Sequence, residues 1–103
     1  MMSRVLVGAA AAIAPGTWKV VEHAGAAVVV LNYQGAFYAF LDRCPHAAAP
    51  LSLGRLRGEE LTCARHGWTF DVTTGAAIPD HPDFRLASVP VLVDGGDVYL
   101  LTA

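Results

Sequence analysis

The heptapeptide CPHAAAP, residues 44–50, places Cys44 and His46 with a single residue between them. Seventeen residues beyond His46 comes a second pair, Cys63 and His66, in the sequence CARH. The chain has only two cysteines and four histidines, so the two pairs use both cysteines and half of the histidines. Thiolates and imidazoles are preferred ligands of transition metals. The pattern C-x-H followed by C-x-x-H therefore predicts a metal or cluster site.

Three interpretations of the two Cys–His pairs compete. The first is a coincidence of small buried cysteines with ordinary histidines, and the repeated Cys-then-His order argues against it. The second is a structural zinc site, although zinc fingers usually group their cysteines in one pair and their histidines in another. The third is a two-iron cluster, in which each loop sends its cysteine to one iron and its histidine to the other. The mixed pairs favour this third interpretation.

The bulk composition limits the class of protein. A chain of 103 residues is the size of one domain, and we expect residues 1–103 to form a single one. The net charge of −2 argues against nucleic acid or an anionic membrane as the main partner. No apolar run is long enough to span a bilayer. Two cysteines in so short a chain do not make a disulfide framework.

Short β-branched and aromatic runs separated by glycine turns predict an all-β domain. Two-residue turns at Ala24-Gly25 and Gln34-Gly35 predict a meander of three strands. The last segment, residues 86–102, reads as one strand, a turn at 94–97 and another strand, while residues 78–85 read as a loop. The other strands are expected at residues 4–7, 18–23, 27–33, 36–41, 60–63 and 68–72.

The amino terminus allows a second interpretation. Arg4 followed by an apolar run through Ala14 resembles a secretory signal peptide. Alanines supply much of that run and make a weak apolar core for a signal, so we favour a first strand at 4–7 followed by an alanine-rich turn.

Longer stretches around the Cys–His pairs resemble a known family. The segments DRCPHAAAPLSLGRL (42–56), LTCARHGWTFDVTTG (61–75) and VPVLVDGGDVYL (89–100) closely resemble the Rieske-type [2Fe–2S] ferredoxins of bacterial ring-hydroxylating oxygenase systems. The resemblance implies an antiparallel β-sandwich with a small cluster-binding subdomain, made by ligand loops at about 43–50 and 63–68 and a covering proline loop at about 76–83. It also implies one [2Fe–2S] cluster, with Cys44 and Cys63 on the inner iron and His46 and His66 on the outer iron.

The same resemblance implies a function. We expect a cytoplasmic, monomeric one-electron carrier that takes electrons from an NAD(P)H-dependent flavin reductase and delivers them to a terminal oxygenase. The alternative is a small Rieske electron-transfer subunit within a larger oxidoreductase complex. No nucleophile–base pair suggests a catalytic activity of its own. We do not expect a Rieske oxygenase, because 103 residues do not include the large catalytic domain of that class.

Residues beside the ligands refine this expectation. Trp68 and Phe70 occupy positions where respiratory Rieske proteins have serine and tyrosine hydroxyls that donate hydrogen bonds to sulfur. Without such donors the reduced cluster is less stable, which favours the low-potential branch of the family. The remaining histidines, His23 and His81, group with no other candidate ligand. Four arginines near the ligands form either a solvated face or a docking rim for an acidic partner: Arg43, Arg55, Arg57 and Arg65.

Overall fold

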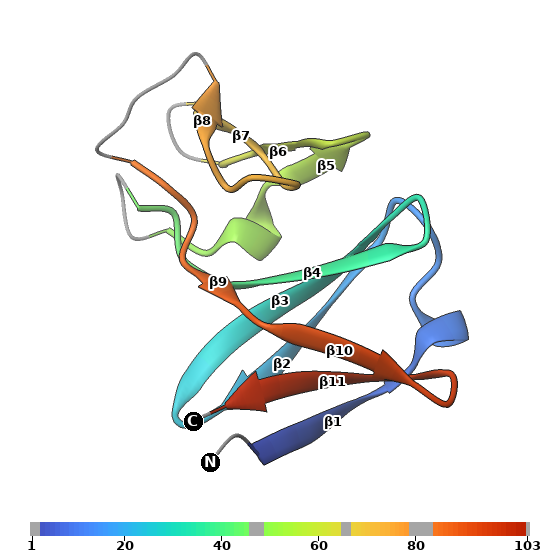
Figure 1. Ribbon diagram of the computed structural model, residues 1–103. Helices are drawn as coiled ribbons and strands as arrows, with labels where there is room; N and C mark the ends of the chain where they lie inside the picture. Colours follow the sequence, from blue (N-terminus) through green and yellow to red (C-terminus); the bar gives the residue numbers. More distant parts are fainter. Residues whose placement is uncertain (1–2, 46–48, 65–66, 79–83, 103) are drawn as a thin grey trace.

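The computed structural model describes residues 3–45, 49–64, 67–78 and 84–102, which form three antiparallel sheets (Figure 1). The terminal sheet has the order β1 (Ser3–Ala9), β11 (Asp97–Thr102), β10 (Val91–Asp94). The central sheet has the order β2 (Trp18–His23), β3 (Ala26–Tyr33), β4 (Ala36–Leu41), β9 (Ser88–Val89). The small sheet has the order β5 (Arg55–Arg57), β6 (Glu60–Thr62), β7 (Thr69–Asp71), β8 (Ala77–Ile78).

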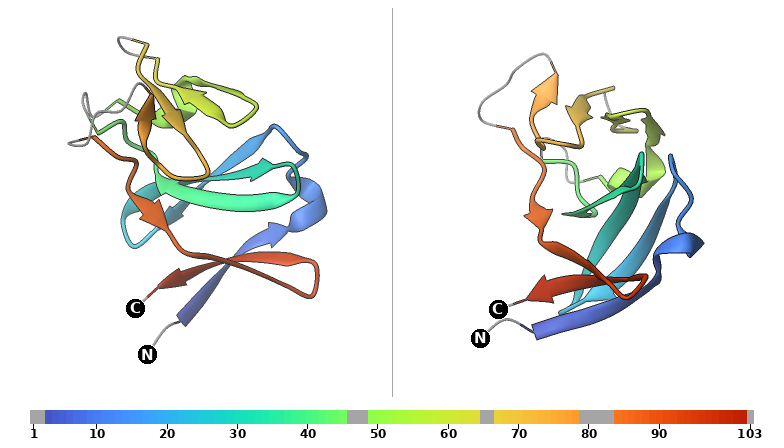
Figure 2. Two further views of the ribbon diagram at one scale, coloured as in Figure 1. Left: turned by 45° about the horizontal axis from the view of Figure 1, so that its top comes forward. Right: turned by 45° about the vertical axis from the view of Figure 1, so that its right-hand side comes forward.

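Strand β3 lies at the centre of the molecule and is buried on both faces. Val28 and Val30 belong to a hydrophobic cluster shared with the terminal sheet, whereas Val29 and Leu31 belong to a second cluster shared with the small sheet. A strand buried on both faces has a continuous apolar sequence rather than an alternating one. This explains the run of four apolar residues at 28–31 and places the central sheet between the other two (Figure 2).

The two predicted hairpins of the central sheet are confirmed. Ala24 and Gly25 have positive φ angles of 53° and 80°, and Gln34 and Gly35 have 52° and 90°. Two consecutive positive φ values are typical of type I′ turns, whose twist matches that of the adjoining strands. The second turn is braced by the buried Asn32, whose Oδ1 accepts a hydrogen bond of 2.7 Å from the N–H of Gly35.

Both ends of the chain join the terminal sheet. The predicted first strand is confirmed and runs from Ser3 to Ala9, with Val7 buried in the cluster shared with β3. The prediction of a single strand before the turn at 94–97 was wrong, because Pro90 divides it. Strand β9 pairs with β4, whereas β10 pairs with β11, so the chain changes sheets at a residue that has no N–H to donate.

The small sheet was predicted only in part. The β6–β7 hairpin is confirmed, but β5 was not predicted, and Ile78, assigned to a loop, lies in β8. Both missed strands are too short to show a periodicity in sequence. The helical elements of the described chain are two short 3-10 turns, η1 (Ala10–Ala12) and η2 (Leu51–Leu53). The predicted all-β sandwich with a smaller subdomain is therefore confirmed.

None of the helices in the described segments has the length and apolar character needed to cross a bilayer.

Candidate metal centre

The two cysteines lie in the same buried core. Cys44 follows strand β4 and is 0% exposed, and Cys63 directly follows β6 and is 2% exposed. Both belong to the hydrophobic cluster between the central and small sheets, together with Leu51 and Phe70. The structure describes both cysteines, and they do not form a disulfide. The fold thus brings both cysteines into one apolar region. The small sheet that borders this region lies at the end of the molecule away from β1 and β11 (Figure 1).

The two ligand loops are closed in the same way. The N–H of Cys44 donates a hydrogen bond of 2.7 Å to the carbonyl of Ala49, and the N–H of Cys63 donates one of 2.7 Å to the carbonyl of Trp68. In each loop the cysteine is therefore tied to the residue five positions later. The same closing bond therefore fixes the backbone at each cysteine.

The histidines of the two Cys–His pairs belong to the residues that the structure does not describe. His46, His66 and the leftover His81 lie outside the described residues, as do residues 79–83 of the predicted covering loop. Within the described segments no three His, Cys, Asp or Glu side chains converge on a metal site. His23 is described, and it is the last residue of β2, outside both ligand loops.

The donor set fits an iron–sulfur cluster. Two ionised thiolates in an apolar core are costly unless a positive group balances them. Two ferric ions contribute +6, two sulfides −4 and two thiolates −2, so a cluster with neutral imidazoles has no net charge. Such a group would satisfy Cys44 and Cys63 without leaving an uncompensated charge between the sheets.

An aromatic wall lies next to the second ligand loop. The Trp68 ring stacks on Phe70 at a centroid distance of 6.4 Å and meets Phe84 edge-on at 4.8 Å. Phe70 is fully buried in the core that contains both cysteines. The side chains of this wall have no hydroxyl group, as the low-potential interpretation requires. Phe84 begins the described chain again after residues 79–83, so its contact ties the second loop to the end of the predicted covering segment.

The sequence did not predict the groups that close the base of the first loop. Asp42 accepts two hydrogen bonds from Ser52, one from the backbone N–H and one from the side-chain hydroxyl, each 2.7 Å long. These residues are ten positions apart, and no local turn signal relates them.

Three of the four arginines near the ligands are described. Arg43, Arg55 and Arg57 are all exposed. The one ion pair within the described segments joins Arg4 to Asp94 at 2.9 Å, so none of these three guanidinium groups forms one there, although Arg57 lies opposite Glu60 in the β5–β6 register. Arg65 lies outside the described residues. The docking rim remains a prediction.

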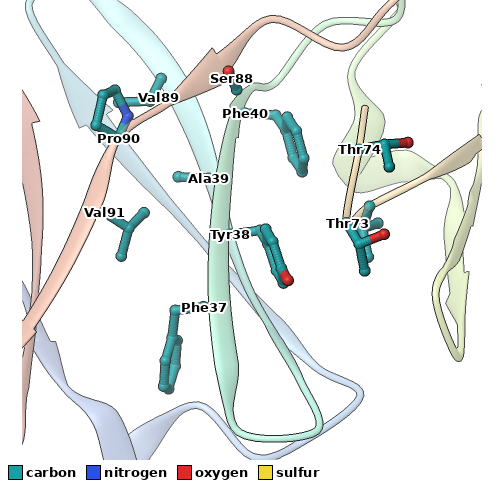
Figure 3. A pocket seen from close by; sticks show the side chains of 11 residues that line it. Phe37, Tyr38, Ala39, Phe40, Thr73, Thr74, Ser88, Val89, Pro90 and Val91 are labelled. Atoms are coloured by element: carbon teal, nitrogen blue, oxygen red, sulfur yellow. The ribbon is translucent and has the colours of Figure 1, made fainter. Parts of the chain in front are cut away.

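A separate hollow of about 310 Å³ lies between β4 and the turn that joins β7 to β8. Figure 3 shows Tyr38 and Phe40 pointing toward Thr73 and Thr74 across it. Its lining has no cysteine or histidine, so this hollow is distinct from the candidate metal centre.

Known proteins resemble the chain over most of its length. The family model described as the Rieske [2Fe-2S] domain matches residues 3–90. Ferredoxin CarAc of Metapseudomonas resinovorans is 38% identical over 95 residues, which cover 91% of this chain and 89% of that protein. The 3-phenylpropionate/cinnamic acid dioxygenase ferredoxin subunit of Escherichia coli (strain K12) is 35% identical over 74 residues, covering 71% and 70%.

A solved structure shows the same fold. A chain in the complex of reduced oxygenase and oxidized ferredoxin in carbazole 1,9a-dioxygenase superposes with a TM-score of 0.84 and 36% sequence identity. The match covers 94% of this chain and 91% of that one.

Proposed function

This chain belongs to the family of Rieske [2Fe–2S] domains, and we propose that it is the ferredoxin of an oxygenase system, passing single electrons from a flavin reductase to a terminal oxygenase. It is an electron-transfer protein with one Rieske-type [2Fe–2S] cluster. When bound, the cluster supplies reversible one-electron exchange. The observation that best supports the proposal is the shared burial of Cys44 and Cys63 in a chain that resembles ferredoxins almost end to end.

The four ligands form part of the proposal. Cys44 and Cys63 bind the inner iron, and His46 and His66 bind the outer iron. Support comes from the two buried thiols, the matching loop closures and the position of each histidine just after its cysteine. The buried side chains of Cys44 and Cys63 would hold the inner iron away from water.

The partners are proposed from the relatives. A similar protein is solved in a complex of oxygenase and ferredoxin, which supports a terminal oxygenase as the electron acceptor. A flavin reductase in the cytoplasm is the electron donor that such a system needs. The exposed arginines near the ligand loops and the side chain of Leu53, which is 69% exposed, provide basic and apolar contacts for a transient complex.

The ligand proposal is tested by single substitutions. Cys44→Ser, His46→Ala, Cys63→Ser and His66→Ala should each lose most of the cluster, measured as bound iron, visible absorption and the EPR signal of the reduced protein. His23→Ala and His81→Ala are matched controls and should keep all three properties. A ligand variant with normal iron content and spectrum would remove that residue from the site.

The carrier function is tested by reductive titration. The purified protein should accept one electron per chain and return it to an added oxidant with no change in iron content. A colourless protein with bound zinc would refute the proposal.

A further inference from the structure

Asp42 and Ser52 meet at the base of the first ligand loop. The backbone N–H of Ser52 donates to Asp42 Oδ1 at 2.7 Å, and the Ser52 hydroxyl donates to Asp42 Oδ2 at 2.7 Å. Both oxygens of one carboxylate are thus bound to the same residue, and both partners are partly buried. The segment 43–51 between them contains Cys44, so the two bonds close the loop at the point where it leaves the sheet.

These bonds are favourable for two reasons. Hydrogen bonds to an ionised carboxylate are shorter and stronger than bonds between neutral groups. Ser52 also lies in the 3-10 turn η2, and the first N–H groups of a helical turn have no partner within it. Pro50, which precedes η2, makes no capping bond with its side chain, so Asp42 caps this turn from across the loop. The cap fixes η2, whose Leu51 is packed in the same core as Cys44.

The far end of η2 reaches the second ligand loop. Gly54 follows η2, and a Cβ atom built on it would overlap the carbonyl oxygen of Thr62. Thr62 is the residue immediately before Cys63. The segment that is hydrogen-bonded to Asp42 therefore packs directly against the backbone next to the second cysteine. A continuous series of contacts joins the base of one ligand loop to the base of the other.

We propose that the Asp42–Ser52 pair is a clasp that sets the spacing between the two ligand loops, which makes Asp42 and Ser52 positioning residues for the cluster. This inference rests on the proposed function, because it requires the two loops to hold one cluster. With the clasp broken, the first loop opens from its base and the cluster escapes more readily. The fold persists, since both hydrophobic clusters remain packed.

The test compares two hydroxyl deletions in the cluster-loaded protein. Ser52→Ala removes the hydroxyl bond of the clasp and leaves its backbone bond in place. Thr73→Ala is the matched control, because the Thr73 hydroxyl donates to Asp71 Oδ1 at 2.6 Å in the β7–β8 turn, which is not part of either ligand loop. Cluster loss is followed as the decay of visible absorption in the presence of an iron chelator, and stability as the urea unfolding midpoint.

Ser52→Ala should lose its cluster about tenfold faster than the wild type, the rate change expected from one hydrogen bond to a charged group. Ser52→Thr, which keeps the hydroxyl, should restore the rate, and Thr73→Ala should match the wild type. The EPR spectrum of the reduced protein should change in Ser52→Ala alone.

Equal rates of cluster loss in Ser52→Ala and Thr73→Ala would overturn the clasp, even if both variants unfold at lower urea. That result would leave the proposed function intact. A wild-type protein that binds no cluster would overturn both. Asp42→Ala removes both bonds and should lose the cluster faster still; if it does not fold, the Ser52→Ala comparison decides.

Discussion

Replacement of Gly54 by alanine tests how tightly the two ligand loops are packed. Gly54 has φ −84° and ψ −154°, an extended conformation that alanine also adopts, so the backbone angles themselves add no strain. The added Cβ would overlap the Thr62 carbonyl oxygen and lie 3.1 Å from the Thr62 carbonyl carbon and 3.2 Å from the Leu51 oxygen. All three neighbours are backbone atoms, which cannot rotate away as a side chain can.

The expected cost follows from that geometry. Forcing an extra methyl group into a packed region typically costs about 1–3 kcal/mol. We expect Gly54→Ala to lie at the upper end, about 2–3 kcal/mol, because relief requires movement of η2 or β6. For a domain of this size such a loss lowers the melting temperature by about 10–20 °C. The assay is urea unfolding followed by circular dichroism, with the midpoint reduced and the slope unchanged.

Gly58→Ala is the comparison. Gly58 has φ +59° and nothing within 4 Å of its added Cβ, so alanine there suffers only the left-handed backbone penalty of about 1 kcal/mol. Gly54→Ala should also accelerate cluster loss, and Gly58→Ala should not. A Gly54→Ala protein with the wild-type urea midpoint would show that the backbone at Thr62 moves aside at no cost in stability, and it would refute the cost expected from these contact distances.

Three further predictions follow from the same structure. Removal of iron should expose the N–H groups of Cys44 and Cys63 to rapid hydrogen exchange while the amides of β3 stay protected; unchanged protection of both cysteines would contradict this. Phe70→Tyr should raise the midpoint potential by about 60 mV if its hydroxyl donates to the cluster or its ligands, and voltammetry with an unchanged potential would exclude that contact. The pKa of Tyr33 is raised above its ordinary value by the hydrogen bond that it donates to Glu59. The native state therefore keeps the Tyr33 proton to a higher pH than the unfolded chain does. The stabilisation of the native state by this hydrogen bond is complete below about pH 10 and is lost as the pH rises through the raised pKa. Urea midpoints measured up to about pH 11 should show the alkaline loss in the wild type and less of it in Tyr33→Phe; identical curves would exclude the effect.

The sequence predicted those elements whose signals are local. Strands β2, β3 and β4 are rich in β-branched or aromatic residues, and each of the turns between them ends in a glycine, which accepts positive φ. Strands β5 and β8 have three and two residues, too few to show a pattern, and they exist because β6 and β7 offer them hydrogen bonds. The change of sheets at Pro90 depends equally on its neighbours, since β4 lies on one side and β11 on the other.

The candidate site likewise has features that the sequence predicted and features that only the structure reveals. The motif identified Cys44 and Cys63 from their spacing to histidine, and the structure places both in one core. The clasp was not predicted, because nothing in the sequence links Asp42 to a serine ten residues later. Gly54 has no positive φ and is instead required by the close approach of another backbone, which its sequence neighbours do not reveal.

The two hydrophobic clusters imply that the order of the small sheet and the ligand loops depends on bound iron more than the order of the other two sheets does. The cluster between the terminal and central sheets contains no cysteine, and it includes Val7, Val98 and Leu100 from strands at the two ends of the chain. The cluster between the central and small sheets includes both Cys44 and Cys63. Iron binding at those two thiols therefore also stabilises the packing of the small sheet against the central sheet. Since β3 contributes to both clusters, it stays ordered by its terminal-sheet contacts when iron is absent, and the sandwich remains as a base on which the ligand loops can close again.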